Sequence, residues 1–461
     1  MLSQIHRGAA SGPRQHARGR PRLALPQPPE RLRPRPASRT APHCPPCIKP
    51  CRPWLLARFA DPHSLAIALL FVTFLAGGFS LHRIDPELRR FGELAYVRTW
   101  LVVVIVGLLL LKRPAKADQV PKLRSAALFA HAVAASQLYI GLTALWSLDG
   151  EGTLPRVLGQ ILLALLIELT LLVVRRRPEK AAGTILDLSL AAGLLYAAGG
   201  LAGGAEHGRM AMFFGGPNVF VRVVSAGVLA SVNRALVTRR LLWLAPAPLL
   251  LVCAVESGSR GGMLALLFTL PVLAWAVWTS GVLRRRPLWW LAAPLAAALS
   301  AAVAGVYVLS QPEVRRYVEE RYLVYAPSSY DPAEVDFGSR DRLFAAAWET
   351  FWERPALGSG LSPIGDFERL DAHPHNLFLA TARDGGVAGL LLLSIPFALL
   401  VVRLGRRLAI EHRMAFVLGC FYLCAAQFSG SYYDCRFLWL YFLVVMPPAA
   451  RLRRALHRPR P

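Results

Sequence analysis

Long apolar segments, separated by short charged ones, fill the chain from about residue 63 onward. An α-helix rises 1.5 Å per residue, so roughly 20 consecutive apolar residues cross the ~30 Å hydrocarbon core of a bilayer. Twelve segments approach this length, although the second and the last are short, and we predict a membrane-spanning helix in each. They are 63–81, 97–111, 125–147, 157–174, 184–203, 216–236, 241–256, 261–282, 287–310, 386–403, 412–430 and 435–450.

The charges between these segments differ on the two sides of the predicted membrane. Basic runs follow the even-numbered segments, whereas the loops after odd-numbered segments are acidic, mixed or short. Lys and Arg near the ends of spans mark the cytoplasmic side. Twelve spans with both termini in the cytoplasm satisfy this rule throughout. The basic runs are 112–124, 175–177, 239–240, 284–286, 403–413 and 451–461.

The longest connection lies between predicted spans nine and ten. Residues 311–374 hold twelve acidic and seven basic residues, which places them on the periplasmic side. Aromatic residues recur at helical spacing within 339–354, so this part is expected to form an amphipathic helix that ends at Pro355. The chain therefore divides into a cytoplasmic tail (1–62), helices 1–9 (63–310), a periplasmic loop (311–385), helices 10–12 (386–450) and a basic cytoplasmic tail (451–461).

Composition supports an all-α polytopic membrane protein. Of 461 residues, 54% are hydrophobic and only 18% are charged, with a mean hydropathy of +0.40. Soluble domains carry about 25% charged residues, and disordered chains are poor in apolar ones, so both classes are excluded. The net charge of +25 would suggest nucleic acid in a soluble protein, but here the basic residues mark a membrane face. Seven cysteines give no disulfide framework.

Residues 1–62 differ from the rest of the chain. They hold twelve basic and two acidic residues, are rich in proline, and lack the apolar core of a signal peptide. Such a segment is expected to be disordered, and the natural start could lie downstream of it. Cys44, Cys47 and Cys51 resemble metal ligands in their spacing, but no fourth ligand is nearby.

Polar residues gather in four clusters at predicted periplasmic helix ends. Charged groups are expensive in hydrocarbon, so each cluster is a candidate functional site. Other interpretations remain open: an asparagine can cap a helix, an arginine can extend to the membrane surface, and aromatics can simply pack. The candidate residues are Arg209, Asn218, Arg222, Arg260, Arg340, Arg342, His373, His375 and Asn376.

The second and fourth clusters indicate the chemistry. Arg260 follows a Gly- and Ser-rich hairpin at a predicted helix start, where free N–H groups and a guanidinium suit phosphate oxygens. His375 follows Pro374 at another helix start, where the positive helix end favours the neutral imidazole that a general base needs. Metal-binding motifs are absent there, so we predict cofactor-free transfer from a lipid-diphosphate donor to a hydroxyl.

These residues resemble a known family. His375-Asn376, nine residues and then Gly386-x-x-Gly389 match the O-antigen ligase signature H[NSQ]-x9-G-x-x-[GTY], and Arg260-x3-Leu264 matches its R-x3-L element. The run from Ser339 through Trp348 to Pro355-x-x-Gly358-x-Gly360 is similar to the segment before that histidine. The wider family comprises O-antigen ligases, O-antigen polymerases and bacterial protein O-oligosaccharyltransferases, and the resemblance covers roughly 63–450.

The resemblance implies a GT-C-like glycosyltransferase in the bacterial inner membrane with its active site on the periplasmic side. The donor would be an undecaprenyl-diphosphate-linked glycan and the acceptor the lipid A–core oligosaccharide, joined with inversion and without ATP or metal. His375 would activate the acceptor hydroxyl or assist at the diphosphate, and Arg260 would hold the diphosphate. Arg209 and Arg222 are assigned from position, and His373 only neighbours the motif.

We favour the ligase among several alternatives. An O-antigen or exopolysaccharide polymerase would use the same donor but a second lipid-linked glycan as acceptor, and no residue separates the two. A protein O-oligosaccharyltransferase would usually bring a further C-terminal periplasmic region. A lipid transporter would place polar groups near the bilayer midplane and show inverted repeats, neither of which the sequence displays. A purely structural membrane protein would not need so many arginines on one side.

Overall fold

The structure is a computed structural model of the 461-residue chain. It describes residues 62–78, 97–111, 123–147, 153–203, 205–206, 209–212, 216–279, 310, 339–361, 374–404, 408–430 and 432–447. The expected tails at 1–62 and 451–461, and the predicted span at 287–310, therefore lie outside the described residues except at single end positions.

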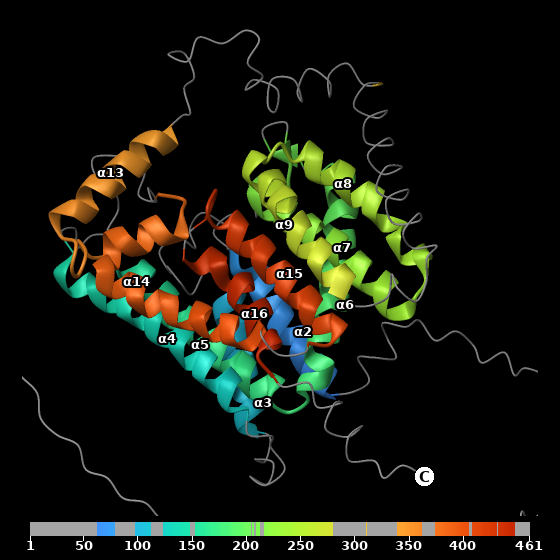
Figure 1. The fold of residues 1–461 in the computed structure, drawn as a ribbon, viewed down its shortest axis with the longest axis horizontal. Coiled ribbons are helices and arrows are strands. Elements are labelled where there is room, and N and C mark those ends of the chain that lie inside the picture. Colours follow the sequence, from blue (N-terminus) through green and yellow to red (C-terminus); the bar gives the residue numbers. More distant parts are fainter. Residues whose placement is uncertain are drawn as a thin grey trace, which may run out of the picture. The chain divides into compact units, whose positions relative to one another are not determined.

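The described part is helical apart from one short hairpin (Figure 1). Its α-helices are α2 (Pro62–Leu75), α3 (Val97–Leu111), α4 (Arg124–Leu142), α5 (Thr153–Val174), α6 (Pro178–Leu201), α7 (Gly216–Thr238), α8 (Pro246–Glu256), α9 (Arg260–Thr279), α13 (Ser339–Glu353), α14 (Leu377–Leu404), α15 (Ile410–Ala425) and α16 (Arg436–Val445). The 3-10 helices are η1 (Ala76–Gly78), η5 (Thr143–Trp146), η6 (Leu241–Leu244) and η8 (Tyr433–Cys435). Strands β1 (Ala205–Glu206) and β2 (Arg209–Met210) pair antiparallel.

Helices occupy every predicted apolar range that the structure describes. Six of them are long and apolar enough to cross a membrane: α4 with η5, α5, α6, α7, α9 and α14. This agrees with a helical multi-pass membrane protein, while the number of twelve spans stays a prediction. Helix α14 begins at Leu377, as expected for a helix start just after Pro374, and Asn376 caps it; the predicted span from 386 onward lies within this helix. The predicted boundary marks a kink at Gly386, whose φ and ψ are 62° and −159°.

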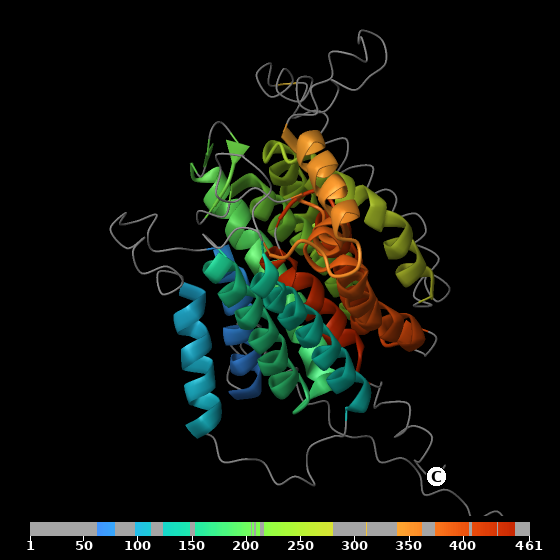
Figure 2. The ribbon, with the colours of Figure 1, turned by 90° about the vertical axis from the view of Figure 1, so that its left-hand side faces the viewer.

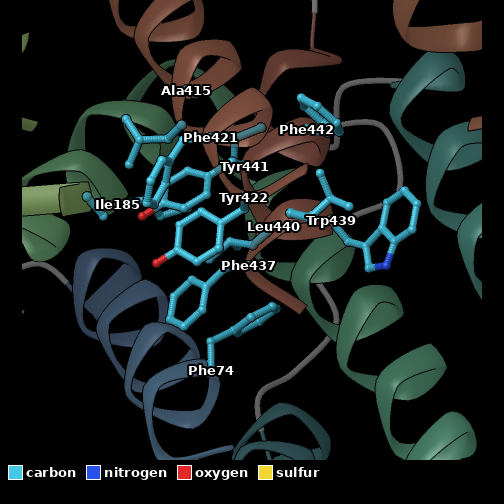
Figure 3. Packing of buried hydrophobic residues seen from close by; sticks show 14 of the residues in the cluster. Phe74, Ile185, Ala415, Phe421, Tyr422, Phe437, Trp439, Leu440, Tyr441 and Phe442 are labelled. Carbon is cyan, nitrogen blue, oxygen red and sulfur yellow. The ribbon is translucent and has the colours of Figure 1, made fainter. Parts of the chain in front are cut away.

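The hydrophobic core centres on α16, in which every residue is buried. Tyr422 of α15 stacks on Phe437 and Tyr441 of α16, with ring centroids 5.2 and 5.5 Å apart, and Figure 3 shows these rings together with Phe74 of α2. Inside a bilayer, helices associate through close packing and polar contacts rather than the hydrophobic effect. The stacked aromatic rings therefore hold α2, α15 and α16 together.

Helices lie side by side in the bundle (Figure 2), and α15 runs opposite to its neighbours α7, α9 and α16. Tyr422 near the end of α15 meets Phe437 near the start of α16, whereas Phe416 meets Phe442 further along. We call the end where α7, α9, α14 and α16 begin and α15 ends the motif end, because it carries the signature. The basic residues at 175–177 and 239–240 lie at the opposite end, where α5 and α7 finish. The described basic runs and the signature are thus separated, as the charge pattern predicts.

Candidate functional site

The signature histidine lies at the entrance to α14. His375 has a positive φ of 49°, an uncommon conformation for a non-glycine residue, and its side chain is half-buried. The next residue, Asn376, accepts a hydrogen bond at Oδ1 from the Leu379 N–H at 3.0 Å. Asn376 is therefore the N-cap of α14. The cap fixes the backbone on which His375 is carried.

The two glycine-rich parts of the resemblance form one unit. Gly386 interrupts α14 with a φ of 62°, and the segment 355–360 lies against this kink. Ser359 N–H donates to the Arg383 carbonyl at 2.8 Å, and Val387 N–H donates to the Pro355 carbonyl at 2.8 Å. A side chain on Gly386 would collide with the backbone of the docked segment. The spacing of glycines in both elements is thus a requirement for close backbone packing.

A buried polar network lies beside the kink. Arg383 Nη2 is 2.6 Å from Asp384 Oδ1, and the Tyr432 hydroxyl donates to Asp384 Oδ2 at 3.0 Å. All three residues are buried. Burial, and next the adjacent Asp384 carboxyl group, raise the pKa of the Tyr432 phenol well above its ordinary value. The hydroxyl therefore remains protonated and able to donate, which ties the kink to the segment that follows α15.

The turn that follows α15 joins the signature to a predicted substrate-binding arginine. We call residues 425–430 the α15 turn. Leu377 N–H donates to the Ala426 carbonyl at 3.1 Å. Arg222 of α7 donates from Nη2 to the carbonyls of Ala425 at 3.1 Å and Ser429 at 2.5 Å, and its side chain is buried. Arg222 thus satisfies carbonyl groups left over at a helix end.

The second cluster meets the same turn. Gly261, directly after Arg260, lies against Phe428 so closely that a Cβ at this position would overlap the Cβ of Phe428. The Ser259 hydroxyl donates to Asn218 Oδ1 at 2.7 Å, which joins the starts of α7 and α9. The structure therefore brings the segments carrying His375, Arg222, Asn218 and Arg260 to one place, although they are far apart in the sequence.

A small pocket opens beside Arg222. Its lining is Val219, Arg222, Val223, Tyr422, Asp434, Arg436 and Phe437. Arg436 is buried, donates to the Phe74 and Tyr433 carbonyls, and lies 3.3 Å from Asp434 Oδ1. Sequence reasoning missed Arg436 and Tyr432, and it assigned no role to the Arg383–Asp384 pair within the signature. Their only signal was a charged or hydroxyl group beside an apolar run.

The remaining predicted residues lie on other elements or outside the described residues. Arg342 is exposed in the first turn of α13, and Arg340 lies two residues before it, directly after the helix start at Ser339. Arg209 belongs to strand β2. His373 lies outside the described residues. Helix α13 itself packs on the first turn of α14, where Leu343 and Ala347 contact Leu379 (Figure 1).

The described part of the site contains arginines and a histidine. Across the described ranges, no three histidine, cysteine, aspartate or glutamate side chains gather as metal ligands would. Guanidinium groups and helix starts are suited to holding phosphate oxygens, and an imidazole is suited to accepting a proton.

Comparison with protein families gives one match. Residues 245–394 match the family model described as O-antigen ligase, so the resemblance is confirmed over this range. The match includes Arg260, Arg340, Arg342, His373, His375 and Asn376. It excludes Arg209, Asn218, Arg222 and the α15 turn. No curated protein matches the chain. The family supports an enzyme for glycosyl transfer of the ligase or polymerase type.

Proposed function

With the O-antigen ligase match over residues 245–394 as the premise, we propose that this protein transfers a glycan from undecaprenyl diphosphate to a hydroxyl of the lipid A–core oligosaccharide. The motif end would face the periplasm and the opposite, basic end the cytoplasm of the inner membrane. As the resemblance implies, transfer would invert the anomeric carbon and require neither ATP nor metal.

The α15 turn is the observation that carries this proposal. It receives Arg222 from α7, Leu377 from the signature helix and Gly261 from the start of α9. Two helix starts, an imidazole and several guanidinium groups therefore share one end of the bundle. Helix starts attract anions and arginines bind phosphate oxygens in a forked geometry, so this end suits a diphosphate beside a base.

The reaction would divide between His375 and the arginines. The acceptor hydroxyl oxygen would form a bond to the anomeric carbon while the bond from that carbon to the diphosphate oxygen breaks. His375 would take the hydroxyl proton as a general base, and Arg260 would stabilise the negative charge on the departing undecaprenyl diphosphate. Because His375 directly precedes the cap of α14, the position of its imidazole depends on that cap.

Complementation provides the test. The chain and its His375→Ala variant would be expressed in a Gram-negative strain that lacks its own ligase, and the lipopolysaccharide would be separated on a gel. We expect restored high-mass bands that disappear in the variant, because proton transfer contributes about 10²–10⁴-fold to such reactions. The Ser394→Ala variant, at an exposed position of α14 beyond the Gly386 kink, serves as a control for expression and insertion.

Other results would redirect the proposal. Longer lipid-linked glycan with an unmodified core would indicate a polymerase, which shares the donor. Correctly inserted protein that leaves both glycan pools unchanged would contradict ligation. Retained flipping of lipid-linked glycan in His375→Ala would favour a transporter.

A further inference from the structure

The first part of α14, residues 377–385, is a helical segment of its own. The non-helical backbone at Gly386 separates it from the rest of α14. Where a kink interrupts a helix, the direction of the part before the kink depends on contacts with neighbouring elements. At the start of this part, Leu377 N–H donates to the Ala426 carbonyl at 3.1 Å. We call residues 377–385 the signature segment, because His375 lies two residues before it.

Donors from outside α14 reach three successive carbonyl groups at the end of the signature segment. The docked segment 355–360 supplies backbone N–H groups to the carbonyls of Arg383 and Asp384. The third carbonyl, that of Gly385, accepts a hydrogen bond at 3.0 Å from the hydroxyl of Tyr139 in α4. Helix α4 packs beside α14 (Figure 1), so this hydrogen bond joins two neighbouring helices at the kink.

The ring of Tyr139 occupies space that glycines of α14 leave open. A Cβ added to Gly385 would lie 3.1 Å from this ring and 2.8 Å from Ile140, closer than ordinary van der Waals contact. At Gly389, the last glycine of the signature, a Cβ would lie 3.4 Å from the same ring and 3.2 Å from the Thr381 carbonyl. Small residues let helices approach closely within a membrane. The glycines on both sides of the kink thus bring α14 against the Tyr139 ring.

The end of α4 also contacts the docked segment. Ser147, directly after η5, donates from its hydroxyl to the Leu361 carbonyl at 3.2 Å. A Cβ at Gly360 would lie 2.7 Å from the Thr143 carbonyl oxygen. The end of α4, the docked segment and the kink therefore form one packed unit, in which the Tyr139 side chain reaches the kink itself.

We propose that Tyr139 is a positioning residue, which holds the signature segment in the orientation that presents His375 to the acceptor hydroxyl. The inference rests on the proposed function and extends the site to α4, outside the matched residues 245–394. Tyr139 acts through the backbone of α14 and not on the reacting atoms. A general base must lie within hydrogen-bond distance of the proton it accepts, so a small rotation of its helix slows the chemical step more than it weakens binding.

A purely structural role is the competing explanation, because a hydrogen bond between two helices stabilises a membrane protein wherever it lies. Losing such a bond would lower the amount of folded protein and leave folded molecules with their normal rate. A positioning role predicts instead that folded molecules keep their affinity for both substrates and lose turnover. Tyr441 offers a matched comparison, because its hydroxyl is also bonded to another helix, to Ser189 at 2.6 Å, but in the aromatic core.

Tyr139→Phe tests the role, because it removes the hydroxyl and keeps the ring. The full chain, Tyr139→Phe and Tyr441→Phe would be purified in lipid nanodiscs and supplied with undecaprenyl-diphosphate-linked O-glycan and lipid A–core. We expect kcat per folded molecule to fall about fivefold in Tyr139→Phe, while both KM values stay within about twofold of wild type. Tyr441→Phe should keep the wild-type kcat and KM values.

Hydrogen exchange measured by mass spectrometry gives a second readout, which does not depend on transfer. We expect the amides of residues 377–385 to exchange about fivefold faster in Tyr139→Phe than in the wild type. In Tyr441→Phe the same amides should exchange at the wild-type rate.

Unchanged kcat in Tyr139→Phe, or an equal loss of kcat in Tyr441→Phe, would overturn the positioning role, and so would unchanged exchange in the signature segment. A wild-type chain that transfers no glycan to the core would contradict the proposed function instead. The exchange measurement would then decide by itself whether Tyr139 holds the signature segment.

Discussion

At the motif end Arg222 donates to the carbonyls of Ala425 and Ser429, and at the opposite end Arg403 donates to those of Met446 and Pro447, at 3.1 and 2.8 Å. Both guanidinium groups are buried and both satisfy carbonyls that a helix end leaves unpaired. The chemistry of the two contacts is the same.

The surroundings of the two pairs of carbonyl groups differ. The α15 turn also accepts from Leu377 of the signature helix and touches Gly261 beside Arg260. The Met446 carbonyl also accepts from Ser125 of α4, far from the signature. An arginine cap thus stabilises the fold at both ends, but only at the motif end would its loss displace candidate catalytic residues. Paired substitutions at the two ends can separate these effects.

The largest difference is expected for glycine substitutions. Gly386→Ala should abolish detectable transfer and destabilise the protein by about 3 kcal/mol or more, because its backbone conformation is one that essentially only glycine adopts. Gly183→Ala, in an open position near the start of α6, should leave transfer unchanged and alter stability by less than about 1 kcal/mol. The lipopolysaccharide gel and thermal unfolding of purified protein would measure both. Full activity of Gly386→Ala would show that the kink is dispensable.

Conservative arginine substitutions should give a smaller difference. Arg222→Lys keeps the charge but loses the fork that reaches two carbonyls, so transfer per folded molecule should fall by about tenfold or more. Arg403→Lys should lose comparable stability, about 1–3 kcal/mol, while its transfer rate stays within about threefold of wild type. Initial transfer rates, normalised to the amount of folded protein, would measure this difference. Equal rate losses in the two variants would remove the distinction between the two ends.

The smallest difference is expected for two buried tyrosines. Tyr432→Phe removes the hydrogen bond to Asp384 at the kink and should lower the transfer rate about fivefold, equivalent to roughly 1 kcal/mol. Tyr441→Phe removes a 2.6 Å hydrogen bond to Ser189 in the aromatic core and should cost similar stability without a rate change. Thermal unfolding would confirm matched losses. A normal rate in Tyr432→Phe would limit the network to a structural role.

Several features of the fold followed from the sequence. Helix formation depends on local spacing of apolar residues, so the described helices fall in the predicted ranges, and Pro355 lies just after the end of α13 as expected. The signature and the R-x3-L element could be recognised as sequence patterns, and the family match confirms the resemblance over 245–394. The separation of basic runs from the signature also followed, because it depends on the number of helices between them.

The ion pair of Arg234 could not be predicted from neighbouring residues in the sequence. From the sequence alone, an arginine near the end of an apolar segment can extend to the membrane surface. The structure instead pairs Arg234 Nε with Asp187 Oδ1 at 2.6 Å, with both side chains largely buried between α6 and α7. The partner lies on another helix, and no periodicity within α7 reveals it. A buried charge of this kind is stabilised by its partner rather than by the membrane surface.

By itself, the sequence determined where helices form, which end of the bundle carries the basic residues, and which short motifs carry arginine and histidine. Only the tertiary structure decided that the segment 355–360 docks on the Gly386 kink and that Arg222 serves the α15 turn. The physical reason is the range of the interactions. Helix propensity and caps act within a few residues, whereas a backbone contact or a guanidinium fork joins groups that only the packing of distant helices brings together.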